Sequence, residues 1–140
     1  QVEFILKNQS TSKGPSLATK GVIQKNNKAN SVINLAGITD WIQTLNLLKN
    51  SYCVVSNDSG GQHLDALVSA PTVGIFGPTV ISFGFRPWNS NAVILETNNL
   101  LKCRPCGKHG PQVCPIGTHQ CMKDVTVDAV WDAIVELLNR

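Results

Sequence analysis

Short apolar runs separated by polar segments predict the strands of this protein. Five runs are rich in β-branched and aromatic residues and end at turn-forming positions, as strands do. They cover residues 2–6, 31–35, 52–55, 72–76 and 92–96. The run at 52–55 is apolar throughout, which is typical of a strand buried on both faces of a parallel sheet. The polar segment 7–16 predicts a loop, while 17–30 has too weak a pattern to place an element.

Apolar residues at helical spacing predict three helices. Asp40 precedes the first, expected over 40–50, and Gln43 occupies the third helical position of a capping box. The apolar stripe expected to dock this helix comprises Trp41, Ile42, Leu45 and Leu48. A second helix follows Gly60, and Thr126 caps a third. The expected buried face of that third helix comprises Val127, Val130, Trp131, Ile134, Leu137 and Leu138.

Strands that alternate with helices indicate an α/β fold. The expected architecture is a Rossmann-like parallel sheet with right-handed crossovers and helices on both faces. A length of 140 residues suits one domain with one core. Hydrophobic residues make up 42% and charged residues 15%, which favours a folded protein over a disordered one. In such a sheet the ligand site lies beyond the carboxyl ends of the strands.

Charge and targeting features exclude two classes of protein. The net charge is only +3 and the lysines never form a run, so no nucleic-acid surface is expected. No apolar stretch approaches the roughly 20 residues that cross a bilayer, so a cytoplasmic protein without a transmembrane segment is expected. The chain begins inside an apolar run without an initiator Met, which suggests a fragment of a longer protein.

The most informative segment follows the run at 52–55 and leads directly into the second helix. Gly60 and Gly61 let the backbone approach a ligand closely, and the helix N-terminus favours phosphate oxygens. Ser59 adds a hydroxyl donor, and His63 could bind phosphate from the first turn. Asp58 would repel phosphate, so a ribose or sugar hydroxyl is its better partner. An ordinary N-cap with a glycine turn has the same pattern, which makes the spacing alone a weak signal.

Several segments together resemble one family. Residues 34–39, 54–64 and 71–79 look like consecutive blocks of glycosyltransferase family 9, the ADP-heptose:lipopolysaccharide heptosyltransferases. Residues 103–106 and 114–122, with their cysteines, resemble members of the heptosyltransferase II kind. The blocks occur in the family's order over most of the chain, which makes the resemblance specific.

The resemblance implies a GT-B architecture, in which two Rossmann-like domains face each other across a cleft. Residues 1–140 match the C-terminal, nucleotide-sugar (donor) binding domain, without its first strand and without the N-terminal acceptor domain. The implied reaction transfers heptose from ADP-heptose to the lipopolysaccharide inner core and requires no cofactor. A cytoplasmic enzyme, peripheral at the inner membrane, is expected. The family's additional phosphate-binding loop has no counterpart here, and 7–16 replaces a short glycine-rich turn, so weakened phosphate binding is expected.

Site residues carry over from the family by position. The block that contains Asp58, Ser59, Gly60, Gly61 and His63 is implied to contact the nucleotide diphosphate sugar. The loop with Gly37, Ile38 and Thr39 is implied to lie by the base, and Thr79 to face the cleft.

The family's catalytic base is an acidic residue of the N-terminal domain, so no catalytic residue is expected in this chain. Asp58 and Asp65 are nearby carboxylates, interpreted as solvated acids at a helix start. The chain alone is therefore expected to be inactive.

Four of the five cysteines are clustered: Cys103, Cys106, Cys114 and Cys121. The first two have C-x2-C spacing, so four thiolates could enclose a tetrahedral zinc or iron ion, with His109 and His119 as substitute ligands. Reduced thiols in a polar loop and two disulfides are the alternatives. Cys53 lies in an apolar run and is expected in the core.

Three other functions fit parts of the sequence. A GT-B enzyme could use another nucleotide sugar, because a fold does not fix the substrate. A non-catalytic nucleotide-binding module could keep the fold without transferring a sugar. A small zinc-dependent interaction domain would account for the clustered cysteines only, and leaves the alternating strands and helices unexplained.

Overall fold

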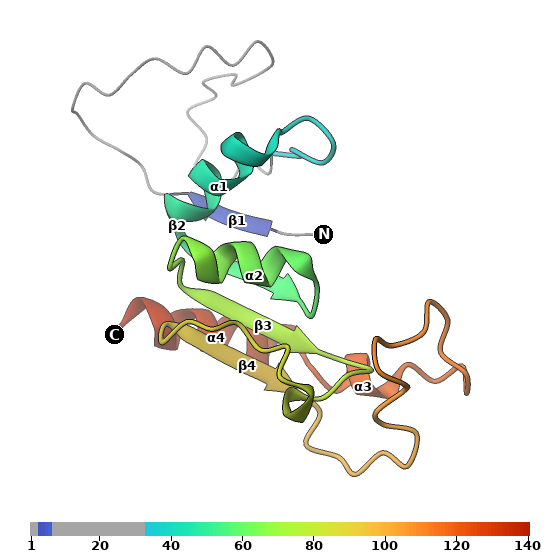
Figure 1. The fold of residues 1–140 in the computed structure, drawn as a ribbon. Coiled ribbons are helices and arrows are strands. Elements are labelled where there is room, and N and C mark those ends of the chain that lie inside the picture. The colour runs from blue at the N-terminus through green and yellow to red at the C-terminus, as the bar shows by residue number, and fades with distance from the viewer. Residues whose placement is uncertain (1–2, 7–32) are drawn as a thin grey trace, which may run out of the picture.

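A four-stranded sheet with helices on both sides forms the centre of the molecule (Figure 1). The computed structural model describes residues 3–6 and 33–140. The strands are β1 (Glu3–Leu6), β2 (Ser51–Asn57), β3 (Thr72–Phe76) and β4 (Ala92–Glu96). The helices are α1 (Trp41–Lys49), α2 (Gly60–Leu67), α3 (Gln120–Lys123) and α4 (Val127–Leu138), with a 3-10 turn at Ile81–Phe83. No helix in these residues has the length and apolar composition needed to cross a membrane.

Three of the strands are parallel, as the sequence predicts. The sheet order is β1-β2-β3-β4, and β3 pairs in parallel with both β2 and β4. Asn57 lies opposite Ile75, and Phe76 lies opposite Glu96, so these strands end at the same edge of the sheet. The α/β fold with a parallel sheet is therefore confirmed, and its carboxyl edge is the place to look for a ligand site.

The first strand differs from the expectation, because β1 pairs with β2 in antiparallel orientation, with Phe4 opposite Val54. An edge strand has the same alternating side-chain pattern in either direction, so the sequence does not encode its polarity. The strand expected at 31–35 is also wrong over its described part, 33–35. There the Asn34 side chain accepts a hydrogen bond from the amide of Ala36 and favours a turn instead. The expected loop at 7–16 and the weakly patterned 17–30 lie outside the described residues.

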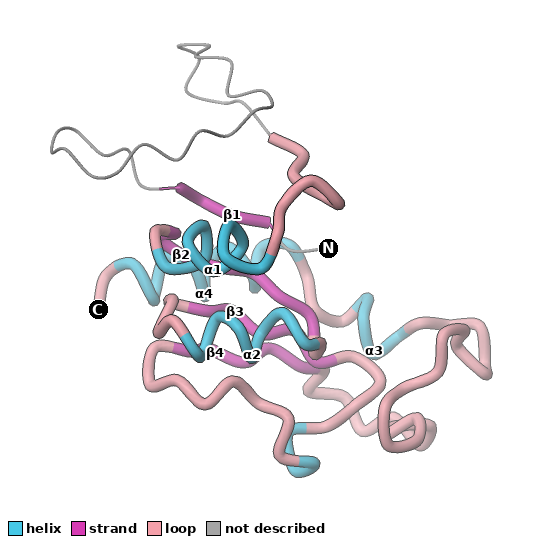
Figure 2. The backbone as a smooth tube through the Cα atoms, turned by 45° about the horizontal axis from the view of Figure 1, so that its top comes forward, coloured by secondary structure: helices cyan, strands magenta, loops and turns pink. Residues whose placement is uncertain are grey.

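Each face of the sheet has its own core. On one face α4 covers a cluster of Cys53, Val73, Ala133, Ile134 and Leu137. On the other face α1 and α2 cover Leu48, Val54 and Ala70. Figure 2 shows the strands between these two helix layers. The expected helices on both faces are thus present.

The helix caps confirm the sequence reading, but the apolar stripes do so only in part. Asp40 and Gln43 form the complete capping box, and the Thr126 hydroxyl accepts from the amide of Ala129. Trp41 and Ile42 are 73% and 70% exposed, because α1 is buried only at Leu48, in its last turn. In α4 the buried residues are Ala133, Ile134 and Leu137. Four residues of the expected stripe of α4 are partly or largely exposed: Val127, Val130, Trp131 and Leu138.

Candidate functional site

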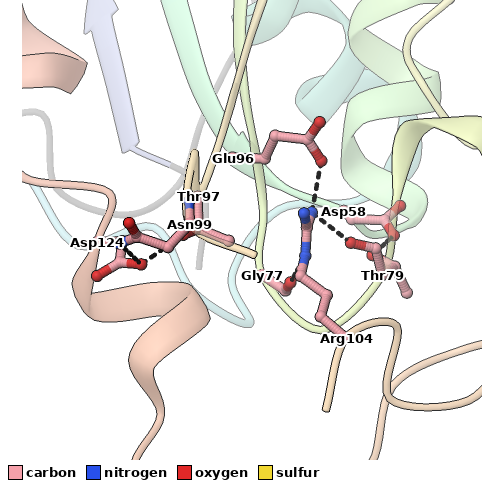
Figure 3. A network of polar contacts seen from close by, with 8 residues as sticks. All are labelled: Asp58, Gly77, Thr79, Glu96, Thr97, Asn99, Arg104 and Asp124. Atoms are coloured by element: carbon pink, nitrogen blue, oxygen red, sulfur yellow. Dashed lines mark hydrogen bonds and ion pairs between the residues drawn. The ribbon is translucent and has the colours of Figure 1, made fainter. Parts of the chain in front are cut away.

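Asp58 and Thr79 join the carboxyl ends of β2 and β3. Asp58 follows β2 directly, and its amide donates to the carbonyl of Ile75 at 3.0 Å. The Thr79 hydroxyl, in the loop after β3, donates to Asp58 Oδ2. Thr79 is only 3% exposed, and Figure 3 shows the two side chains in contact. The structure therefore brings together two residues that the sequence assigned to the site from separate motifs.

Gln62 completes this arrangement, although the sequence reading did not single it out. Its Nε2 donates to Asp58 Oδ1 at 2.8 Å and to the carbonyl of Phe85, also at 2.8 Å. Gln62 is fully buried in the first turn of α2. The spacing of four residues between Asp58 and Gln62 is the signal that could have indicated the pair. Both oxygens of Asp58 accept protein hydrogen bonds, and each keeps a further lone pair for a ligand hydroxyl.

The N-terminus of α2 faces solvent at the same edge. Ser59 is the N-cap with extended backbone, and its side chain makes no capping hydrogen bond. Ser59, Gly60 and His63 are exposed, and Gly61 is partly exposed. A Cβ added at Gly60 would meet no atom within 4 Å, so packing within the chain does not require glycine there. Exposed amide groups, the Ser59 hydroxyl and the His63 side chain thus lie at the N-terminal turn of α2, the part of a helix that favours anions.

Gly37 and Thr39 lie on a separate turn before α1. Gly37 has φ +74°, a left-handed conformation that favours glycine, and the amide of Ile38 donates to the carbonyl of Leu35. The Thr39 hydroxyl accepts from the Thr44 hydroxyl at 3.1 Å. In Figure 1 this turn lies at the end of the sheet where α2 begins. Its contact with a nucleotide base stays a prediction.

Arg104 connects the cysteine segment to the site, and the sequence reading missed this role. Its guanidinium donates to the carbonyls of Gly77 and Thr79, both at 2.7 Å, and forms an ion pair with Glu96 (Figure 3). The Arg104 side chain is only 10% exposed. A planar guanidinium can hold several acceptors at once, so Arg104 fixes the loop after β3 that carries Thr79. The sequence showed the arginine but not its distant partners.

The carboxylates near the site differ from the solvated acids expected. Asp65 is fully buried, and neither of its oxygens has a hydrogen-bond partner among the described residues. This burial raises the pKa of Asp65 to about 7. Asp58 is partly buried and holds Thr79 and Gln62. Burial was missed for Asp65 because an acidic residue in a short helix is normally solvated.

Three of the four clustered cysteines line one pocket. The pocket has a volume of about 140 Å³ and is lined by Cys106, Cys114, Cys121 and His119, among others. Cys106 Sγ donates to the carbonyl of Cys103 at 2.8 Å. Burial, and then the neighbouring Cys103, Cys121 and Cys114 thiols, raise the pKa of the Cys106 thiol.

The cysteines of this cluster form no disulfide, and their side chains do not enclose a metal position as they stand. All five cysteines are free, and Cys53 lies in the core as expected. Across residues 3–6 and 33–140, no three His, Cys, Asp or Glu side chains are grouped closely enough to hold a metal ion. His109 stacks on Phe85, with ring centroids 5.9 Å apart, whereas His119 lines the pocket. The metal assignment stays a prediction.

Comparison with known proteins independently supports the resemblance to glycosyltransferase family 9. The sequence model of glycosyltransferase family 9 (heptosyltransferase) matches residues 10–113. Lipooligosaccharide heptosyltransferase 2 of Campylobacter jejuni is 33% identical over 120 residues, which cover 84% of this chain and 34% of that protein. The protein of the same name from Haemophilus influenzae is 33% identical over 110 residues, covering 77% of this chain and 30% of that protein. The chain thus spans about a third of the length of these relatives.

A solved structure shares the fold. The ADP-heptose lps heptosyltransferase II of E. coli superimposes with a TM-score of 0.58 and 28% sequence identity. The match covers 76% of this chain and 27% of that one.

Proposed function

Because the chain belongs to glycosyltransferase family 9, the heptosyltransferase family, we propose that it is the nucleotide-sugar-binding domain of a GT-B enzyme. The proposed donor is ADP-heptose, and the proposed acceptor is the inner core of lipopolysaccharide or lipooligosaccharide. The acceptor would be bound by a second domain that residues 1–140 do not contain. The names of the relatives support these ligands: the E. coli structure is called an ADP-heptose lps heptosyltransferase, and the other two are called lipooligosaccharide heptosyltransferases.

The observation that carries the proposal is the exposed start of α2 beside the Asp58–Thr79 pair. The amides of the first helical turn and the Ser59 hydroxyl would bind the diphosphate. His63, also exposed, would add a donor or a positive charge to the same phosphates. Asp58 is held from two sides and would accept a hydroxyl of the ribose or the sugar. Gly37 and Thr39 would lie by the adenine base.

The same geometry predicts that the isolated domain is inactive. A base must lie within hydrogen-bonding distance of the acceptor hydroxyl. Asp65 is fully buried, and Asp58 is engaged with Thr79 and Gln62, so neither is available to remove that proton. We infer that the base comes from the acceptor-binding domain and that residues 1–140 alone transfer no sugar.

Isothermal calorimetry with ADP and ADP-heptose tests the proposal. His63→Ala is the variant of choice because His63 is exposed and its loss leaves the core intact. A hydrogen bond to a charged group contributes about 1.5 kcal/mol, so binding should weaken about tenfold. Leu67→Ala, at the opposite end of the same helix and 72% exposed, is the matched control and should bind normally.

Two results would contradict the proposal. One is the absence of heat at ligand concentrations on the order of a millimolar. The other is equal weakening by His63→Ala and Leu67→Ala, which would place the ligand elsewhere. Equal affinity for ADP and UDP would favour a different nucleotide sugar.

A further inference from the structure

The loop between β4 and α3 has no helix or strand of its own and contains three of the four clustered cysteines, while the fourth, Cys121, lies in α3. It covers residues 97–119 and extends from the sheet in orange in Figure 1. Long loops without secondary structure are uncommon in folded domains unless they bind something or are disordered. Three cysteines around one pocket of about 140 Å³, with a fourth beside Cys106, therefore require an explanation beyond chain connection.

The first half of the loop is firmly held to the sheet. Arg104 bonds to the loop after β3, and the amide of Cys106 donates to the carbonyl of Pro78 at 2.8 Å. At the base of the loop, Asp124 accepts from Thr97 and Asn99. These contacts fix the backbone of the C-x2-C motif in position, so a ligand would find that half of the loop already ordered.

The backbone around the thiols has the turns of a metal-binding knuckle. The C-x2-C segment ends at Gly107, with φ +73°, and the segment from Cys114 ends its turn at Gly117, with φ +69°. The amide of His119 points at Cys114 Sγ over 3.5 Å. Amide hydrogen bonds to a sulfur stabilise a thiolate, and second-shell bonds of this kind orient metal ligands.

The charges of the loop suit a cluster of thiolates. Residues 97–119 contain no Asp or Glu but include Lys102, Arg104 and Lys108. Four thiolates around a divalent cation carry a net charge of about −2. Lys102 and Lys108 would offset part of that charge, which reduces the cost of placing it beside the protein, whereas Arg104 is already paired with Glu96.

We propose that Cys103, Cys106, Cys114 and Cys121 bind one thiophilic divalent ion, zinc or iron, in a tetrahedral structural site. On binding, the four thiols release their protons to solvent, and each sulfur forms one bond to the metal without any change in oxidation state. Because no three of these side chains are grouped closely enough to hold an ion in the described residues, binding would draw the thiols together, and the Cys106 sulfur would turn from the carbonyl of Cys103 into the pocket. His109 stacks on Phe85 and does not line the pocket, so it is not among the proposed ligands. The bound ion holds the second half of the loop, and it acts independently of any nucleotide sugar.

Elemental analysis of protein purified under reducing conditions without chelator tests this site. One zinc or iron per chain is expected, and the two metals are distinguished directly. Cobalt added to the metal-free protein should give the intense visible bands of a tetrahedral thiolate site. Cys106→Ser and Cys121→Ser should each lose the stoichiometric metal. Cys53→Ala, a thiol in the core away from the loop, should retain it.

A second measurement covers variants that fold poorly. A mercurial reagent that modifies thiols should release one metal ion per chain from the unmutated protein as the four clustered thiols react. The proposal is overturned if the reduced protein takes up no stoichiometric zinc, iron or cobalt. It is equally overturned if mass analysis of freshly purified protein finds two disulfides among the four clustered cysteines. Neither outcome depends on whether the start of α2 binds ADP.

Discussion

The two faces of the sheet are built from different kinds of side chain. The helix on one face, α4, buries only apolar residues: Ala133, Ile134 and Leu137. The face covered by α1 and α2 also has an apolar cluster, but α2 buries Gln62 and Asp65 as well. Gln62 holds Asp58 in the candidate site, whereas α4 buries no polar side chain of its own.

This difference separates stability from function. Apolar burial stabilises a fold in proportion to the area removed from water, and the buried side chains of α4 contribute in this way only. Buried polar groups cost free energy unless they are paired. On the α2 face Asp65 and the Gln62 Oε1 atom have no partner among the described residues. The buried polar atoms without a partner, which lower the stability of the fold, thus lie on the face that carries the candidate site.

The largest expected effect concerns Asp65, whose pKa is raised to about 7 by burial. Between about pH 4 and pH 7 the folded state keeps a proton on Asp65 that the unfolded state has released. The free energy of unfolding is therefore highest below about pH 4 and falls as the pH rises toward 7. A shift of this size corresponds to a fall in the free energy of unfolding of roughly 4 kcal/mol over that window. Asp65→Asn should remove this slope and be more stable than the parent at pH 8.

Urea unfolding across pH measures this directly. Asp132→Asn, on an exposed position of α4, is the control and should keep the parent slope. If Asp65→Asn kept the parent's pH dependence of the free energy of unfolding, burial of the Asp65 carboxylate would not be its cause.

The next effect concerns the apolar face. Leu137→Ala removes a buried side chain that is 7% exposed and should lower the free energy of unfolding by about 3 kcal/mol. Val127→Ala in the same helix, 85% exposed in the parent, should cost less than about 0.5 kcal/mol. ADP affinity of the folded fraction should be unchanged in both variants. If fully folded Leu137→Ala protein bound ADP more weakly than the parent, the α4 face would also contribute to binding, and the two faces would not have separate roles.

A smaller effect is expected at the junction of β2 and β3. Thr79→Val keeps the shape of the side chain but removes its hydrogen bond to Asp58, at a cost of about 1–2 kcal/mol. Affinity for ADP-heptose should fall several-fold because Asp58 is no longer held from both sides. Thr79→Ser restores the hydroxyl and should recover both properties. Thermal unfolding and calorimetry are the measurements, and failure of Thr79→Ser to recover affinity would contradict the role given to the hydroxyl.

The smallest effect on stability is expected at Gly60. Its added Cβ would lie in open space, so Gly60→Ala should change the free energy of unfolding by less than about 1 kcal/mol, in the stabilising direction. Binding of ADP should nevertheless weaken, because the new methyl group occupies the space beside the diphosphate. Normal affinity in a stable Gly60→Ala protein would mean that no ligand approaches the backbone there.

Local patterns predicted the elements whose determinants are local. The capping box at Asp40, the cap at Thr126 and the strands at 72–76 and 92–96 were all foreseen, since each depends on residues within a few positions. The antiparallel direction of β1 was not, because polarity depends on the connection rather than on the strand's own pattern.

The candidate site shows the same contrast between features set by neighbouring residues and features set by distant ones. The start of α2 was predicted from consecutive residues, and Thr79 through the family resemblance. The links through Arg104 span 25 to 27 positions along the chain and left no local signal. The burial of Asp65 likewise depends on packing between α2, β2 and β3, which helical periodicity does not reveal.

The central claim, that a nucleotide diphosphate sugar binds where α2 begins, is tested most directly by amide chemical shifts. In a titration of isotope-labelled protein with ADP-heptose, the account predicts saturable shifts of the Ser59, Gly60 and Gly61 amides, with amides of α4 unmoved. The claim would be contradicted if these three amides stayed unshifted while the ligand bound, or if the saturable shifts clustered on α4.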